Sequence, residues 1–269
     1  MKKFIHVLSM SKSGTTRLAY ALNCIGIDAH HEIIDIRPVY LKWMKKRFSL
    51  SQVSKLDVES AKILFQEELL KYLQVTNSNM LSDGYFADIS HYLATLYPII
   101  DNITDSMNID TRSIHLTRSF FPHRTIVYNT YTFVNNVKIS DNTIHTDRDL
   151  YYPAELSWCS DIEWKDWVTM SHFEKLCWYW KFHQEYFLEG RREIFHVEDF
   201  NFDNKSLEIL KILYPEATEK QKEIFKRELF YTPESPYGTN ATYTLETTDE
   251  EKEIYERICG PTLKKLGYD

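Results

Sequence analysis

Short apolar runs alternate with segments of helical spacing along much of this chain. The first run, 4–8, is apolar and β-branched, as in a buried strand. The segment that follows, 18–25, has helical spacing, and its apolar residues share one face: Leu18, Ala21, Leu22 and Ile25. Further strands are expected near 80–87, 113–117 and 193–197.

Three longer stretches also differ in their pattern of apolar and polar residues. Residues 40–75 are expected to be helical, with an apolar stripe made of Ala61, Leu64, Phe65, Leu69 and Leu73. A second amphipathic helix is expected around 173–187, where the apolar side again has helical spacing: Phe173, Leu176, Trp180, His183 and Phe187. Residues 129–167 are polar and without a clear period, which favours long loops, and such loops are often functional.

Composition indicates one enzyme-sized domain spanning 1–269. Apolar residues make up 43% of the 269 positions and aromatic residues 14%, which is typical of a folded chain. A formal charge of −7 argues against nucleic acid or an anionic membrane surface as the main partner. The apolar run near the N-terminus is too short for a signal sequence, and no stretch approaches a membrane span.

The cysteines indicate the compartment. Cys24, Cys159, Cys177 and Cys259 are far apart and form no CxxC pair. We therefore expect buried thiols in a reducing compartment and a cytoplasmic protein.

The junction after the first strand carries the chemistry that an anion needs. Gly14 lies where strand turns into helix, so backbone N–H groups, the helix dipole and a residue without Cβ coincide. Lys12 adds a full positive charge, and Thr15 and Thr16 add hydroxyl donors. The nucleotide triphosphatase P-loop pattern is absent, because the lysine comes two residues before the glycine instead of directly after it.

The K-S-G-T-T stretch, with Lys12 as its lysine, resembles the 5′-phosphosulfate loop of sulfotransferases, P-[KR]-S-G-T-[ST]. The resemblance implies that the 5′-phosphosulfate binds to the loop residues Ser11, Lys12, Ser13, Gly14, Thr15 and Thr16. The strand ending in Arg118 resembles the family's 3′-phosphate segment. That segment also carries a serine, and Tyr128 or Asn129 stands in its place here.

Two later stretches resemble the same family in the expected order. Residues 192–200 resemble its strand ending in [RH]-[YV]-E-D-[LF], and the C-terminal helix ends in L-G-Y. The glycine-rich R-K-G-x-x-G-x-W-K segment of the cytosolic aryl and steroid enzymes is missing, so the chain is closer to the bacterial and Golgi-type branches. The implied fold is a P-loop-containing, sulfotransferase-like α/β structure: a three-layer sandwich with a mainly parallel central sheet and its site at the carboxyl ends of the strands.

The resemblance implies transfer of a sulfuryl group from 3′-phosphoadenosine 5′-phosphosulfate (PAPS) to a hydroxyl or amine, leaving 3′-phosphoadenosine 5′-phosphate (PAP). The leaving group is already a stable anion, so no metal is expected. Lys12 would stabilise the negative charge that develops on the leaving oxygen. Glu32 matches the position of the catalytic glutamate in tyrosylprotein-type and bacterial glycolipid enzymes and is the expected base. His31 and His91 are alternatives.

Two other functions stay open. One is a small-molecule kinase that uses ATP and Mg²⁺, for which Asp83 is the best strand-end carboxylate. The other is a non-catalytic nucleotide-binding protein of the same fold. The acceptor is a small molecule, a glycan or a peptide, and the sequence leaves both its identity and the oligomeric state open.

Overall fold

The computed structural model describes residues 3–10, 13–31, 84–89, 94, 97–119, 170–201, 203–231 and 248–268. The chain divides into two compact units. The first contains Met1–Asp35, Gln66–Ser119 and Phe187–Thr242, and the second contains Ile36–Phe65, Phe120–Tyr186 and Tyr243–Asp269. The expectation of one domain over 1–269 stays a prediction.

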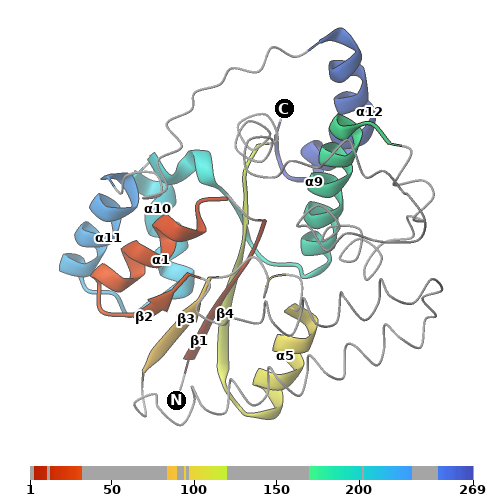
Figure 1. Cartoon of the computed structure of the whole chain (residues 1–269). Helices are drawn as coiled ribbons and strands as arrows, with labels where there is room; N and C mark the ends of the chain where they lie inside the picture. The colour runs from red at the N-terminus through yellow and green to blue at the C-terminus, as the bar shows by residue number, and fades with distance from the viewer. Residues whose placement is uncertain are drawn as a thin grey trace, which may run out of the picture. The chain divides into compact units, whose positions relative to one another are not determined.

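A five-stranded parallel sheet forms the centre of the first unit (Figure 1). Its strands are β1 (Lys3–Ser9), β2 (Asp28–His30), β3 (Tyr85–Asp88), β4 (Asp110–Thr117) and β5 (Ile194–His196), in the order β2-β3-β1-β4-β5. The expected α/β class and the parallel sheet are confirmed. The strands expected near 4–8, 80–87, 113–117 and 193–197 correspond to β1, β3, β4 and β5, whereas β2 was not expected.

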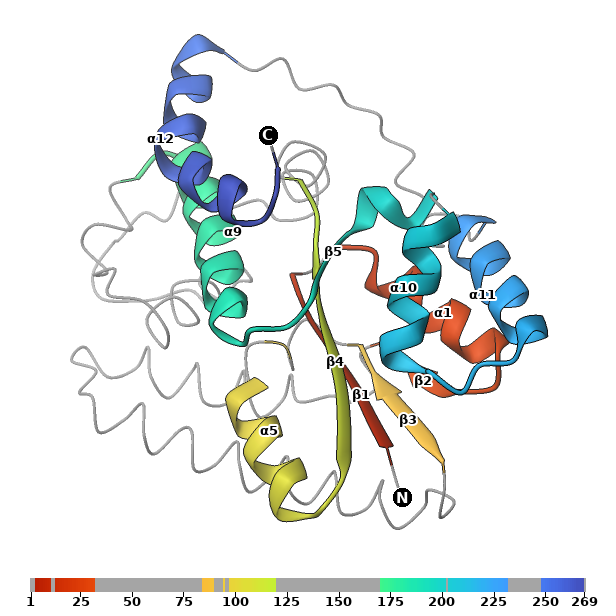
Figure 2. The ribbon, with the colours of Figure 1, turned by 180° about the vertical axis from the view of Figure 1, so that it is seen from behind.

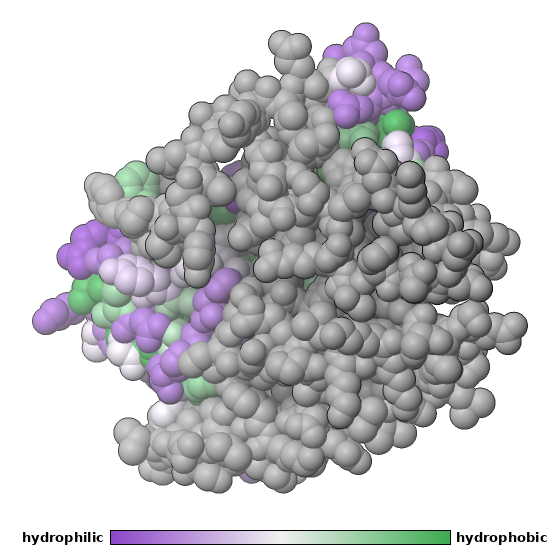
Figure 3. Space-filling model, in the orientation of Figure 1, coloured by the Kyte–Doolittle hydropathy of each residue, from purple (hydrophilic) through white to green (hydrophobic). Residues whose placement is uncertain are grey.

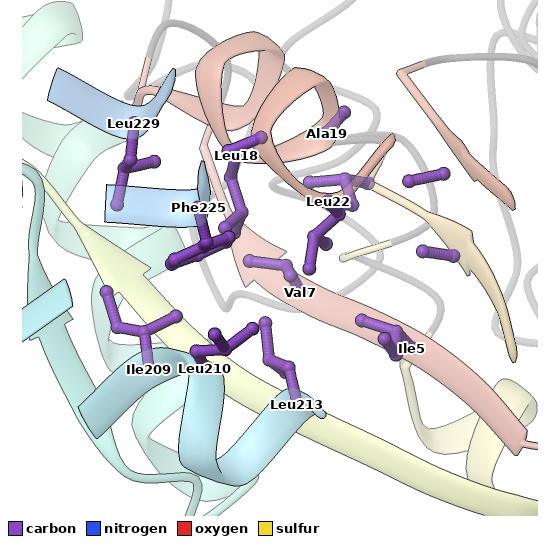
Figure 4. Close-up of a cluster of buried hydrophobic side chains, with 14 of the residues drawn as sticks. Ile5, Val7, Leu18, Ala19, Leu22, Ile209, Leu210, Leu213, Phe225 and Leu229 are labelled. Carbon is purple, nitrogen blue, oxygen red and sulfur yellow. The ribbon is translucent and has the colours of Figure 1, made fainter. Parts of the chain in front are cut away.

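One face of the sheet carries the apolar core. Successive residues of a strand point to opposite faces, so Ile5 and Val7 of β1 lie on the same side as their register partners Ala87 and Ile114. Three helices cover this side: α1 (Thr15–Cys24), α10 (Asp203–Leu213) and α11 (Glu219–Tyr231). Figure 4 shows side chains from all three helices meeting β1.

The helical spacing expected for 18–25 is confirmed. Leu18, Ala21 and Leu22 are buried in α1, and Ile25 is buried just beyond the end of the helix. Burial of a leucine or isoleucine side chain stabilises the fold by about 1.5–3 kcal/mol. The apolar face of α1 therefore holds the helix N-terminus against the sheet.

Helix α5 (Tyr97–Ser106) lies on the other side of the sheet from α1, α10 and α11 in both ribbon views (Figures 1 and 2). A Cβ added at Gly190 would come within 2.9 Å of Leu8 and 3.3 Å of Tyr97, so the chain after residue 187 also packs on this face. Arg192 binds Asp101 of α5 at 2.5 Å. Helices thus cover both faces, as in an α/β sandwich.

An ion pair joins the amino end of the sheet to the turn between α10 and α11. Lys3 binds Glu216 and donates a hydrogen bond to the Tyr85 hydroxyl at 2.8 Å. The hydrogen bonds from Lys3 and then from Tyr85 lower the pKa of Glu216 to about 2. The charged form of Glu216 is therefore the form that the folded chain favours.

The second unit contains α12 (Asp249–Lys265) and the part of α9 (His172–Glu189) up to Tyr186. The amphipathic pattern expected around α9 is confirmed, because Leu176 and Trp180 are fully buried. Thr262 of α12 donates a hydrogen bond to Glu185 of α9 at 2.9 Å. Most of the visible part of α12 is hydrophilic (Figure 3), as expected of the polar side of an amphipathic helix.

The cysteines differ in part from the expectation of four buried thiols. Cys177 and Cys259 are buried, and the Cys259 thiol lies 3.6 Å from the Cys177 carbonyl oxygen. Burial raises the pKa of Cys259 far above its usual range. Cys24 is exposed at the end of α1, so the expectation is wrong for this residue. Cys159 lies outside the described residues. Among the described helices none is both long and apolar enough to cross a membrane.

Candidate functional site

The carboxyl ends of β1 and β4 flank the point where the sheet topology reverses. From β1 the chain continues to β2 and β3 on one side, and β4 and β5 lie on the other side. In open parallel sheets, ligands bind in the crevice at such a switch point. The two segments expected to hold phosphate, the loop before α1 and Arg118, come directly after these two strands (Figure 1).

The first segment is a tight turn centred on Gly14. The Ser13 N–H donates a hydrogen bond to the Met10 carbonyl at 3.3 Å, and Leu18 N–H donates to the Gly14 carbonyl at 3.1 Å. Gly14 is the N-cap of α1, with φ 75°, the left-handed conformation that favours glycine. It has no side chain with which to cap the helix, and within the described helix the first turn holds no acidic residue. The first N–H groups of α1 have no partner inside the helix and suit an anion.

A second constraint also requires glycine at this position. A Cβ on Gly14 would lie 3.1 Å from Phe200 and 3.1 Å from Val197. Both belong to the 3-10 helix η2 (Val197–Asn201), which follows β5. The turn therefore packs closely against the segment after β5, which carries Glu198 and Asp199, the E-D of the stretch 192–200.

The hydroxyls of the turn differ in exposure. Ser13 and Thr15 are buried, whereas Thr16 is exposed. The Thr15 hydroxyl lies 3.0 Å from Nε2 of His31, the residue after β2. One of the two alternative bases is thus in contact with the turn. His31 directly follows β2, a strand that sequence periodicity did not predict.

Arg17 is a cation near the turn that sequence reasoning missed. Its guanidinium donates hydrogen bonds to the carbonyl oxygens of Leu229 and Phe230, the latter at 3.1 Å, and it lies 5.6 Å from the centre of the Phe200 ring. A positive charge in the first turn of α1 is unfavourable with that helix dipole, but the carbonyl end of α11 offsets this cost. Arg17 therefore joins α1 to α11.

The second segment begins with Arg118, which is partly exposed directly after β4. The N–H of the next residue, Ser119, donates a hydrogen bond to the Glu198 carboxylate at 2.8 Å. Asp199 instead faces His196, with 3.5 Å between the carboxylate and Nδ1. The acidic pair after β5 thus has two separate partners.

Polar side chains are buried at the ends of the same two strands. Ser9 ends β1 and Thr117 ends β4, and both are fully buried. Within the part of the chain that the structure describes, neither hydroxyl has a hydrogen-bond partner. A buried hydroxyl left in this state costs about 1–3 kcal/mol, so each of these two positions calls for a partner such as a bound water or ligand.

Buried polar residues also line the sheet face opposite α1. His6 and Asp88 are register partners on this face, and His115 packs edge-on against Phe187 at 5.6 Å between ring centres. The apolar run 4–8 predicts a buried strand correctly, but it gives no signal that the histidine inside it lies beside a buried aspartate.

Six of the expected site residues lie outside the described residues: Ser11, Lys12, Glu32, His91, Tyr128 and Asn129. The same holds for Asp83 and for the whole of the segments 40–75 and 129–167. Their proposed roles stay predictions from the sequence. Among the described side chains, no group of three or more His, Cys, Asp and Glu residues is arranged to hold a metal ion.

No protein-family model matches this chain, and comparison with curated proteins finds no match either. The fold and the site therefore define the class on their own: an α/β chain with a parallel sheet and a helix N-terminus capped by a left-handed glycine at its switch point.

Proposed function

We propose that this chain is a sulfotransferase with a P-loop-like fold, which uses PAPS as its sulfuryl donor. The observation that carries the proposal is the left-handed Gly14 at the N-terminus of α1, beside the end of the central strand. This geometry supports anion binding, and the sulfotransferase-like motif around it supports the choice of a phosphosulfate as the anion.

In this proposal the donor lies across β1 and β4. The 5′-phosphosulfate takes the backbone N–H groups after Gly14, the Thr15 and Thr16 hydroxyls, and the charge of Lys12. The 3′-phosphate takes Arg118, together with Tyr128 or Asn129. The parallel pairing of β1 with β4 supports this assignment of the two phosphates, because the loop before α1 and Arg118 follow neighbouring strands.

Sulfuryl transfer needs mainly correct positioning of the two substrates and stabilisation of the developing negative charge. A base removes the proton of the acceptor while the acceptor oxygen attacks sulfur in line with the leaving phosphate. Glu32 is the proposed base. The contact between His31 and Thr15 supports the end of β2 as the source of this group, since Glu32 is the next residue in the chain.

The test is a thermal-shift panel with the full chain and three ligands: PAP without metal, ATP with Mg²⁺, and ADP. A ligand at 100 times its Kd stabilises the fold by about 2.7 kcal/mol. For a chain of this size that corresponds to a rise in Tm of about 5–10 °C. We expect this rise with PAP in the presence of a chelator. Stabilisation by ATP and Mg²⁺ alone would overturn the proposal in favour of the kinase.

Turnover separates an enzyme from a nucleotide-binding protein of the same fold. PAP release from PAPS is measured with phenolic, sugar and peptide-tyrosine acceptors in turn. We expect release that depends on one acceptor class. Tight PAP binding without release in any mixture would favour the non-catalytic alternative.

A further inference from the structure

The hydrogen bond between Glu198 and Ser119 lies where the sheet ends. In β4, N–H groups two residues apart face β5, and the His115 N–H donates to the Glu193 carbonyl at 2.9 Å. The register continues to the pair Thr117 and His196, which is the last of the ladder. By the same period of two, Ser119 carries the next N–H on the β5 side.

The backbone of β5 does not continue far enough to receive that N–H. After His196 the chain turns into η2, which begins at Val197. The Glu198 side chain accepts from Ser119 instead, at 2.8 Å. A carboxylate acceptor makes this a charge-assisted bond, which is stronger than the neutral bond it replaces. Glu198 therefore extends the β4 ladder by one step beyond the end of β5.

The peptide held in this way is the one that joins Arg118 to Ser119. Holding its N–H restricts the backbone rotation at Arg118, which sets the direction in which the arginine side chain leaves the strand. We propose that Glu198 is a positioning residue for Arg118 and thereby determines the preference for a nucleotide that carries a 3′-phosphate. This inference rests on the proposed function, in which Arg118 binds the 3′-phosphate.

The experiment compares binding of PAP with binding of adenosine 5′-monophosphate by titration calorimetry. The ratio of the two Kd values is the preference for the 3′-phosphate. Glu198→Ala is expected to reduce this ratio about tenfold and to leave binding of the monophosphate within about twofold of wild type. A purely structural role would weaken both ligands alike.

Two variants control for charge and for folding. Glu198→Gln keeps a side-chain oxygen that accepts from Ser119, so its ratio should stay within about threefold of wild type. Asp199→Asn removes a charge from the same turn, but its partner is His196, so its ratio should not change. Should Glu198→Ala fail to fold, Glu198→Asp replaces it, because its shorter side chain loses the reach to Ser119 but keeps the charge.

A double-mutant cycle tests the route of the effect. If Glu198 acts through Arg118, adding Glu198→Ala to the Arg118→Ala variant should change the ratio of the two Kd values by less than about twofold. An undiminished effect there would overturn the inference, as would an unchanged ratio or tighter PAP binding in Glu198→Ala alone. A wild-type chain without any preference for PAP would overturn the proposed function itself and the inference with it.

Discussion

Replacing Gly14 with alanine tests the turn at the candidate site most directly. The substitution adds one methyl group to a residue with φ 75°. The left-handed conformation costs a residue with a Cβ about 1–2 kcal/mol. The added Cβ also meets Val197 and Phe200 at 3.1 Å, so the η2 side chains must shift by a few tenths of an ångström.

Gly26 provides a matched control in the same unit. Its φ is 91°, so alanine there carries the same kind of backbone strain, but nothing lies within 4 Å of the added Cβ. The effect on the unfolded chain is the same for both substitutions and cancels. The difference between the variants therefore isolates the contact with η2, which as overpacking is expected to cost about 1–3 kcal/mol.

The assay is thermal unfolding of both variants with and without PAP. At about 2–4 °C per kcal/mol, Gly14→Ala should melt about 2–12 °C below Gly26→Ala. PAP binding should weaken about tenfold or more in Gly14→Ala only, because the shift moves the N–H groups of α1. Equal melting temperatures and unchanged PAP affinity would contradict this expectation, because the close packing against η2 would then not be what requires glycine at position 14.

Three further predictions follow from charges and proton affinities. Lys12→Ala and Arg118→Ala should each weaken PAP binding by about one to two decades, measured by calorimetry, and only Arg118→Ala should abolish the preference for a 3′-phosphate. Glu32→Gln should lower turnover about 10²–10⁴-fold with nearly unchanged PAP affinity. Normal turnover in Glu32→Gln together with no turnover in His91→Ala would instead identify His91 as the base. Glu216 has a pKa lowered from 4.5 to about 2, so its ion pair stabilises the fold above about pH 4.5 and is lost as pH falls through about 2. Since Glu216 is half exposed, Glu216→Gln should cost less than about 1 kcal/mol in urea unfolding at pH 7 and only a small part of that at pH 2, and an equal cost at both pH values would contradict the assignment.

Local signals predicted the strands β1, β3, β4 and β5 and the helices α1, α9 and α12, whereas the helices α5, α10 and α11 were not predicted. The apolar runs of β1 and β4 and the helical spacing of α1 and α9 are visible within windows of a few residues. The C-terminal helix begins at a capping box between Thr248 and Glu251, which is again a local feature. β2 escaped prediction because a strand of three residues, Asp28 to His30, has no period to read and forms by pairing with β3.

The turn at Gly14 could be predicted from the sequence as an anion site, because the glycine, the strand before it and the helix after it are neighbours in the chain. Its contacts could not. The Thr15–His31 contact joins residues 16 positions apart, and Ser119 and Glu198 are 79 apart. Such pairs depend on the strand order and on the register of the sheet, and no pattern of hydrophobic and polar residues specifies these locally.

Neighbouring residues in the chain specify the strands β1 and β4, the helix α1 and the position of the turn that ends β1. Which polar groups meet at that turn depends on tertiary packing. The parallel register brings the ends of β1, β4 and β5 to one edge, so Gly14 packs on Val197 and Glu198 receives the Ser119 N–H. Side chains distant in sequence meet there because burying the apolar face of the sheet under α1, α10 and α11 fixes the strands relative to one another.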